Sequence, residues 1–188
     1  MLRQGNYFDL FSIKPVFSLD LADLRERYFA LQREVHPDRF ANTTDQERLS
    51  SVHHTSYVNA AYTALKDPVK RACYLLETMG VVVDFENNTQ MSASFLMEQM
   101  EWRESLEALH LAYHNGAEAA FNRKAFDELV LIIDHAFVDR LNTLTRVFIN
   151  YPFVLGDAVI EQSLNLIREL VFLKKIKEEL DVLEDEFD

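Results

Sequence analysis

The chain has 188 residues, of which 48% are hydrophobic, enough for one large domain or two small ones. Only four Gly and four Pro occur, which argues against a hairpin-rich β protein, so we predict an all-α fold. No run of about 18 apolar residues and no secretory signal is present, so we expect a cytoplasmic protein that does not span a membrane. The single cysteine, Cys73, fits a reducing compartment because it has no partner for an internal disulfide.

The net charge of −12 is unevenly distributed. Residues 1–80 contain 10 Lys and Arg against 10 Asp and Glu, whereas residues 81–188 contain 9 against 21. Nucleic acids and acidic membranes repel such a surface, so we expect neither as a partner. The excess of acidic residues in the second half indicates either a contribution to solubility alone or a binding partner with a basic surface.

The first predicted element is a short aromatic run at residues 6–11, long enough for one or two helical turns. Asp20 then provides a cap for a helix that extends to Val35. On a wheel of 3.6 residues per turn, the apolar side chains of this helix fall on one arc and predict its core face. They are Leu21, Leu24, Tyr28, Leu31 and Val35.

The tripeptide His36-Pro37-Asp38 follows this helix directly. Proline lacks an N–H group and disfavours helix at the preceding residue, so we predict that the helix ends here and the chain turns back. Thr44-Asp-Gln-Glu47 reads as a capping box that begins a second helix, which ends at Asp67-Pro68. A short helix from Val69 to Met79, closed by Gly80, follows. The two longer helices therefore form a finger with the tripeptide at its tip.

Beyond a linker at residues 81–91, the pattern predicts three long helices. Ser92 or Ser94 caps the first, which extends to about Tyr113; the second reaches about Asn150, and the third begins at Gly156-Asp157. Short connections between long helices indicate an antiparallel three-helix bundle.

The first bundle helix carries two apolar sets. Its core stripe consists of Phe95, Trp102, Leu106, Leu109 and Tyr113. Leu96, Met97 and Met100 lie on the outer face among charged residues, which indicates either a protein-binding site or burial by neighbouring helices. Phe172 in the third helix also falls outside its apolar arc, although a large aromatic residue in a bundle more often belongs to the core.

Catalytic and metal-binding patterns are weak. His110 and His114 have the i, i+4 spacing of metal ligands, but a third ligand from Glu118 or His135 requires proximity that the sequence does not establish. Cys73 lies among apolar residues and is predicted to be buried rather than nucleophilic. The four glycines form no phosphate-binding loop, so we expect no ATP hydrolysis by this chain, no cofactor and no bound metal.

Residues of the first half resemble a J-domain. The matching segments are Tyr28 and Leu31 with the His36-Pro37-Asp38 loop, and Asn59–Ala72 at the predicted end of the finger. The resemblance implies that the chain stimulates ATP hydrolysis by a DnaK-type chaperone. It assigns the stimulation to His36, Pro37 and Asp38, and docking to Arg25, Arg27, Arg33 and Arg39. Phe29, Ala30 and Glu34 replace residues that are commonly basic in J-domains, which implies a dedicated chaperone.

The second half resembles the HscB family, the J-proteins dedicated to iron–sulfur cluster biogenesis, through the segments Phe95–Glu104 and Arg168–Lys174. The resemblance implies an L-shaped protein with a J-domain at 1–80 and a scaffold-binding bundle at 81–188. Its partners would be a scaffold protein similar to IscU and a chaperone similar to HscA. Without N-terminal cysteines the chain resembles the bacterial members. The implied scaffold contacts are Leu96, Met97, Met100, Glu101, Arg103, Glu104, Ala108 and Phe172.

We therefore predict a non-enzymatic co-chaperone that promotes iron–sulfur cluster transfer. Two alternatives stay open at this point. In the first, the chain is a general adaptor for unfolded clients, although it lacks the Gly/Phe-rich linker and zinc module of general J-proteins. Alternatively, it would be a metal-dependent helical bundle that uses His110 and His114.

Overall fold

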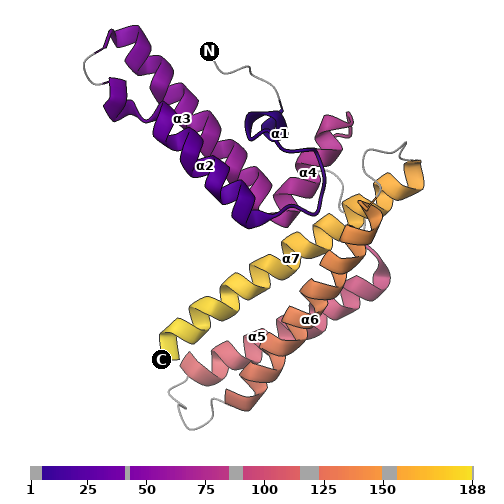
Figure 1. Cartoon of the computed structure of the whole chain (residues 1–188). Coiled ribbons are helices and arrows are strands. Elements are labelled where there is room, and N and C mark those ends of the chain that lie inside the picture. The colour runs from indigo at the N-terminus through magenta and orange to yellow at the C-terminus, as the bar shows by residue number, and fades with distance from the viewer. Residues whose placement is uncertain (1–5, 41–42, 85–90, 115–122, 150–155, 188) are drawn as a thin grey trace. The chain divides into compact units, whose positions relative to one another are not determined.

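The structure is a computed structural model that describes residues 6–40, 43–84, 91–114, 123–149 and 156–187. All regular elements in these ranges are helical, which confirms the all-α prediction (Figure 1). The chain folds as two compact units, one of residues 1–83 with 148–155 and the other of residues 84–147 with 156–188. The assignment of separate roles to residues 1–80 and 81–188 stays a prediction.

The first unit contains α1 (Tyr7–Leu10), α2 (Leu21–Val35), a 3₁₀ turn η1 (Pro37–Phe40), α3 (Asp45–Lys66) and α4 (Pro68–Thr78). The predicted caps are confirmed. The Asp20 carboxylate accepts hydrogen bonds from two backbone N–H groups of α2, and Thr44 and Glu47 form a capping box on α3. Asp67 caps α4, and Gly80 follows its end with φ +82°, a conformation that glycine adopts without strain.

Helices α2 and α3 run antiparallel and form the finger (Figure 1). Leu24 and Val35 of α2 are buried, as are Val58, Ala61 and Leu65 of α3. Midway along α2, the Tyr28 ring stacks on the Tyr62 ring of α3 with the centroids 4.0 Å apart, and the Tyr28 hydroxyl donates a hydrogen bond to Asn59. These contacts fix α2 against α3 and thereby the position of the loop at its end.

Leu21 departs from the prediction that it belongs to the core face. It is 48% exposed. It is the first residue of α2 and lines an open groove together with Lys66, the last residue of α3. Because α3 ends there, it covers only part of the Leu21 side chain.

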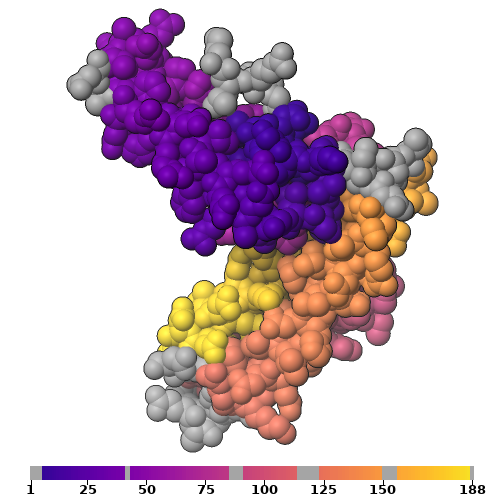
Figure 2. Space-filling view, in the orientation of Figure 1, coloured from indigo at the N-terminus to yellow at the C-terminus, as the bar shows by residue number. Residues whose placement is uncertain are grey.

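The second unit consists of α5 (Ala93–His114), α6 (Arg123–Val147) and α7 (Asp157–Phe187), packed side by side as an antiparallel bundle (Figure 1). The Ser92 hydroxyl accepts a hydrogen bond from the Phe95 N–H and so caps α5. The core contains the predicted Phe95, Trp102, Leu106 and Leu109, with Tyr113 partly buried against them. Helix α6, salmon to orange in Figure 2, lies at the surface in this view. Its side chains Leu131 and Val138 are exposed.

Within the part of the chain that the structure describes, no helix has the length and apolar character needed to cross a membrane.

Candidate protein-interaction sites

The last carbonyl of α2 is held by side chains of α3. The Val35 carbonyl oxygen accepts hydrogen bonds from the Ser51 hydroxyl at 2.7 Å and the Thr55 hydroxyl at 3.0 Å. Carbonyls at the end of a helix lack partners within the helix, so these hydroxyls satisfy a group that would otherwise be buried without one. These hydrogen bonds hold the end of α2 against α3, and the tripeptide begins directly after it.

The tripeptide itself is open to solvent. His36 is the C-cap residue that follows α2, and its carbonyl accepts the Arg39 N–H at 3.0 Å, which closes the turn. The His36 Nδ1 atom lies 3.5 Å from the Asp38 carboxylate and accepts the Asp38 backbone N–H at 3.3 Å. The Asp38 side chain is 90% exposed and that of His36 about half exposed. The loop therefore presents an imidazole and a carboxylate side by side on an outer surface, a geometry suited to contact with another protein.

The four arginines predicted to dock the chaperone are not equally available for contact with a partner. Arg27 is engaged within the chain, since it pairs with Asp23 and donates to the carbonyls of Phe11 and Ser12 at 3.0 Å each. These hydrogen bonds connect α2 to the turn that follows α1. Arg25, Arg33 and Arg39 are exposed. Arg39 also donates to the Arg33 carbonyl at 3.2 Å, which directs its side chain back along α2.

The outer face of α5 carries three exposed apolar side chains. Leu96, Met97 and Met100 are 45%, 65% and 63% exposed, so the neighbouring helices of the described chain do not bury them. Of the two interpretations left open by the sequence, the structure therefore favours a binding surface. The other contacts predicted for α5, namely Glu101, Arg103, Glu104 and Ala108, also lie on exposed positions.

Phe172 on α7 differs from these three residues. Its ring is partly buried, meets the Phe95 ring edge-on with centroids 5.8 Å apart, and lies 6.5 Å from the Trp102 ring. The Arg103 guanidinium covers it from the solvent side, 5.6 Å from the ring centroid. Of the two possibilities that the sequence left open for Phe172, an exposed apolar residue or a core residue, the structure therefore favours the second. A wheel of α7 alone does not show that aromatic residues of α5 flank this position.

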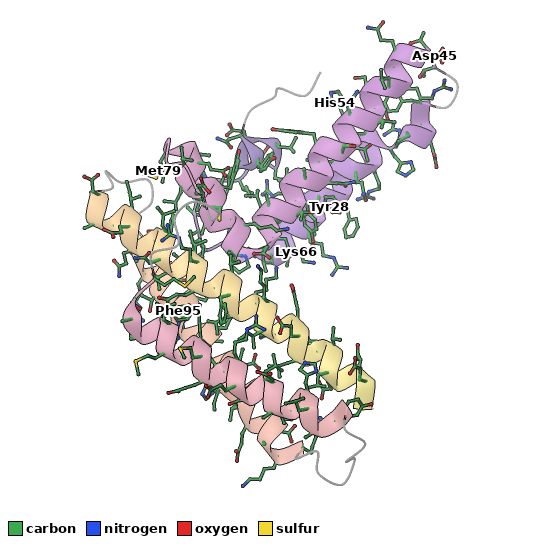
Figure 3. The ribbon with its side chains drawn as sticks, turned by 180° about the vertical axis from the view of Figure 1, so that it is seen from behind. Tyr28, Asp45, His54, Lys66, Met79 and Phe95 are labelled. Atoms are coloured by element: carbon green, nitrogen blue, oxygen red, sulfur yellow. The ribbon has the colours of Figure 1, made fainter. Side chains whose placement is uncertain are left out.

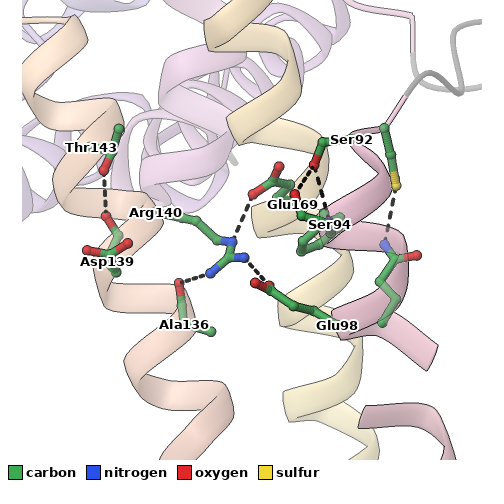
Figure 4. A network of polar contacts seen from close by, with 11 residues as sticks. Ser92, Ser94, Glu98, Ala136, Asp139, Arg140, Thr143 and Glu169 are labelled. Atoms are coloured by element: carbon green, nitrogen blue, oxygen red, sulfur yellow. Dashed lines mark hydrogen bonds and ion pairs between the residues drawn. The ribbon is translucent and has the colours of Figure 1, made fainter. Parts of the chain in front are cut away.

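Arg140 joins all three helices of the bundle, and the sequence analysis missed it (Figure 4). Its guanidinium, on α6, pairs with Glu98 of α5 and with Glu169 of α7, the latter at 2.8 Å. It also lies 5.1 Å from the Phe95 ring centroid and 5.8 Å from that of Trp102. Burial raises the pKa of Glu169, and the hydrogen bond from Arg140 opposes that shift. This one guanidinium therefore pairs with two carboxylates from two other helices.

We expect the Arg140→Ala variant to lower the free energy of unfolding of the bundle by about 3 kcal/mol, because it leaves the partly buried Glu169 without its cation. Urea unfolding followed by fluorescence of Trp102, the single tryptophan and a core residue of the bundle, measures this change. Lys124→Ala, which removes an exposed pair with Glu128, is the matched control and should change stability by less than about 0.5 kcal/mol. Equal effects of the two variants would contradict the role assigned to Arg140.

The metal-site hypothesis gains no support from the described residues. No group of three or more His, Cys, Asp and Glu side chains able to hold a metal ion occurs among them. The side chain of His114 and all of Glu118 lie outside the described residues. His135 is exposed on α6.

Cys73 is partly buried on α4, and burial raises the pKa of its thiol to about 11. We therefore expect iodoacetamide at pH 8 to alkylate the folded protein about a hundredfold more slowly than the urea-unfolded chain, because only the thiolate reacts. The rate should rise as pH approaches 11. Mass spectrometry of timed samples measures it, and similar rates for folded and unfolded protein would show that Cys73 is accessible and ionised.

The comparisons with known proteins agree with this arrangement. Residues 91–181 match the family model described as the HSCB C-terminal oligomerisation domain. A co-chaperone protein HscB homolog from Shewanella loihica is 38% identical over 180 residues, which cover 96% of this chain and 98% of the relative. The chain belongs to the HscB family of co-chaperones. The homolog from Shewanella frigidimarina is 40% identical, with coverage of 96% and 97%.

Solved structures of HscB proteins have the same fold. Chaperone HscB from Vibrio cholerae aligns with a TM-score of 0.81 and 31% identity, over 98% of this chain and all of that one. Human co-chaperone HscB aligns with the same TM-score and 27% identity, over 97% of this chain and 83% of the human one. The match extends over both units, so both the finger and the bundle belong to the family fold. The relatives are named co-chaperones, and their names indicate no catalytic activity of their own.

Proposed function

We propose that this HscB-family chain binds an iron–sulfur scaffold protein of the IscU type and stimulates ATP hydrolysis by a dedicated DnaK-type chaperone of the HscA type. The chaperone then holds the scaffold, and the cluster passes on to its recipient. The observation that carries the proposal is the exposed His36 and Asp38 pair at the end of α2 in a family member whose other unit exposes Leu96, Met97 and Met100.

The loop acts on the chaperone rather than on a substrate. His36 and Asp38 face solvent, and the nearest polar partner of each is the other residue or the turn backbone. An imidazole that is about half exposed and a carboxylate that is 90% exposed do not enclose a small substrate. They suit polar contacts with groups of the ATPase, which carries out the hydrolysis. Arg25, Arg33 and Arg39 supply the positive charge that steers this encounter, while Arg27 stabilises the fold of α2.

The scaffold binds the outer face of α5 in this proposal. Leu96, Met97 and Met100 form its apolar centre, and methionine adapts its shape to a partner at little cost. Exposed Glu101, Arg103 and Glu104 surround that centre and set orientation through charge, and the small Ala108 permits close approach. Phe172 contributes indirectly, because its ring packs against Trp102 and the Arg103 guanidinium.

The test of the whole proposal is the single-turnover rate of ATP hydrolysis by the chaperone, measured alone, with this chain, with the scaffold, and with both. We expect this chain to raise the rate and the scaffold to raise it further. No increase with the folded chain would contradict the proposed function.

A further inference from the structure

Two hydroxyl groups of α3 bind one carbonyl of α2, which is not the contact that such side chains usually make. Serine and threonine inside a helix commonly donate to the carbonyl four residues earlier in the same helix. The hydroxyls that do so in the bundle are those of Ser105, Thr143, Thr145 and Ser163. Ser51 and Thr55 donate instead to the Val35 carbonyl, 16 and 20 residues away in the sequence. We call these two residues the hydroxyl pair.

The hydroxyl pair lies in a sheltered part of the finger. Ser51 is 3% exposed and Val35 is 8% exposed, so little water reaches this carbonyl. In Figure 3, Asp45 marks the start of α3 at the tip of the finger, and His54 precedes Thr55 by one residue. A carbonyl oxygen has two lone pairs, enough for both hydroxyls. Helix α3 therefore fills the capacity of the Val35 carbonyl to accept hydrogen bonds.

Continuation of α2 into the tripeptide would need that same carbonyl. In an α-helix the Arg39 N–H would bond to the carbonyl of Val35, four residues earlier. Here the Arg39 N–H bonds to the His36 carbonyl at 3.0 Å, the shorter spacing of the 3₁₀ turn η1. Pro37 removes only its own N–H donor, and helices can continue past a proline with a kink. The hydroxyl pair thus disfavours the continued helix where Pro37 alone does not exclude it.

We propose that Ser51 and Thr55 are positioning residues for the trigger, because they keep the tripeptide in the turn that presents Asp38 to the chaperone. The inference rests on the proposed function and adds to it the residues that set the maximal rate of hydrolysis. Ser51 is buried and Thr55 partly buried, so they act through the loop.

Loss of the hydroxyl pair leaves the docking surface intact. Arg25 and Arg33 lie on exposed positions of α2 that precede the loop, and the conformation of the loop does not change them. The chaperone then binds loops in the turn and loops in the continued helix, and only the first are active. The active fraction of bound complexes therefore falls, while the affinity of docking is kept.

The experiment is a titration of the full chain into the HscA-type chaperone, with the single-turnover rate of ATP hydrolysis as the readout. It compares the parent protein with the double variant Ser51→Ala and Thr55→Val, which removes both hydroxyls and nearly preserves the side-chain volumes. We expect the maximal rate to fall about tenfold, because a loop that holds the turn for about a tenth of the time gives a tenth of the rate. The concentration for half-maximal stimulation should stay unchanged.

Two variants are the matched controls and should keep both values of the parent protein. Thr55→Ser retains the hydroxyl at the same position. Thr145→Val removes a hydroxyl that donates within α6. A fall in the maximal rate for Thr55→Ser equal to that of the double variant would overturn the inference, because the packing of the threonine methyl group would then be responsible.

A maximal rate like that of the parent protein, for a double variant with unchanged helix content by circular dichroism, would also overturn the inference. So would a raised half-maximal concentration with an unchanged maximal rate, since the hydroxyl pair would then act on docking. If the double variant does not fold, Thr55→Val replaces it and must give a lower maximal rate than Thr55→Ser. Failure of the proposed function gives a different result, in which the parent protein itself does not stimulate the chaperone at any concentration.

Discussion

The Asp38→Asn variant is expected to lose at least nine tenths of the stimulation of chaperone ATPase, even at saturating concentration. The substitution keeps the shape of the side chain and removes its charge. The Asp38 side chain is 90% exposed and its carboxylate lies 3.5 Å from the His36 imidazole, two residues earlier in the same loop, so the fold does not depend on this carboxylate. The lost function is therefore a lost contact with the partner. Removal of one charged partner from a desolvated interfacial pair typically costs about 2–5 kcal/mol, well above the 1.4 kcal/mol of a tenfold change.

The single-turnover hydrolysis rate, measured over a range of co-chaperone concentrations, separates the loss of triggering from the loss of docking. Asp45→Asn is the matched control, because Asp45 is equally exposed, lies in the first turn of α3 and pairs with Arg48 alone among the described residues. It should stimulate as well as the parent protein. If Asp38→Asn also stimulates fully, the loop has no role in triggering.

The position of the tripeptide was predictable because it follows from local rules. Proline after His36 ends a helix, and Thr44 with Glu47 begins the next one. Both signals lie within a few residues of the structure they determine. The helices of the bundle were predictable for the same reason, since a repeated apolar stripe places Phe95, Trp102 and Leu106 on one face of α5.

The residues that the sequence left undecided, predicted wrongly or did not reveal all depend on contacts between helices. Phe172 packs beside Trp102 because α5 lies next to α7, and Leu21 is exposed because α3 ends opposite it. Arg140 occupies a position on α6 that resembles any surface arginine in the sequence, yet it meets carboxylates 42 residues before it and 29 residues after it. No periodicity within one helix contains this information.

The second large effect is expected for substitutions on the exposed face of α5. We expect Leu96→Ala combined with Met100→Ala to raise the dissociation constant for the scaffold protein at least tenfold. Each side chain is about half exposed or more in the free chain, and burial of a large apolar side chain in an interface contributes roughly 1.5–3 kcal/mol when complete. Removal of two such anchors exceeds the 1.4 kcal/mol of a tenfold change even if each is only partly buried in the complex.

Isothermal titration of the scaffold into each variant measures the dissociation constant. The matched control is the double substitution Leu131→Ala and Val138→Ala on α6, whose side chains are 56% and 52% exposed. The control should bind as the parent protein does, because its positions lie on a different helix of the bundle. Phe172→Ala is less suited to this test. Its ring packs on Phe95 and Trp102, so the variant changes the bundle core together with the binding face. Equal affinity of the α5 variant and the α6 control, with unchanged helix content by circular dichroism, would place the scaffold on another surface of the chain.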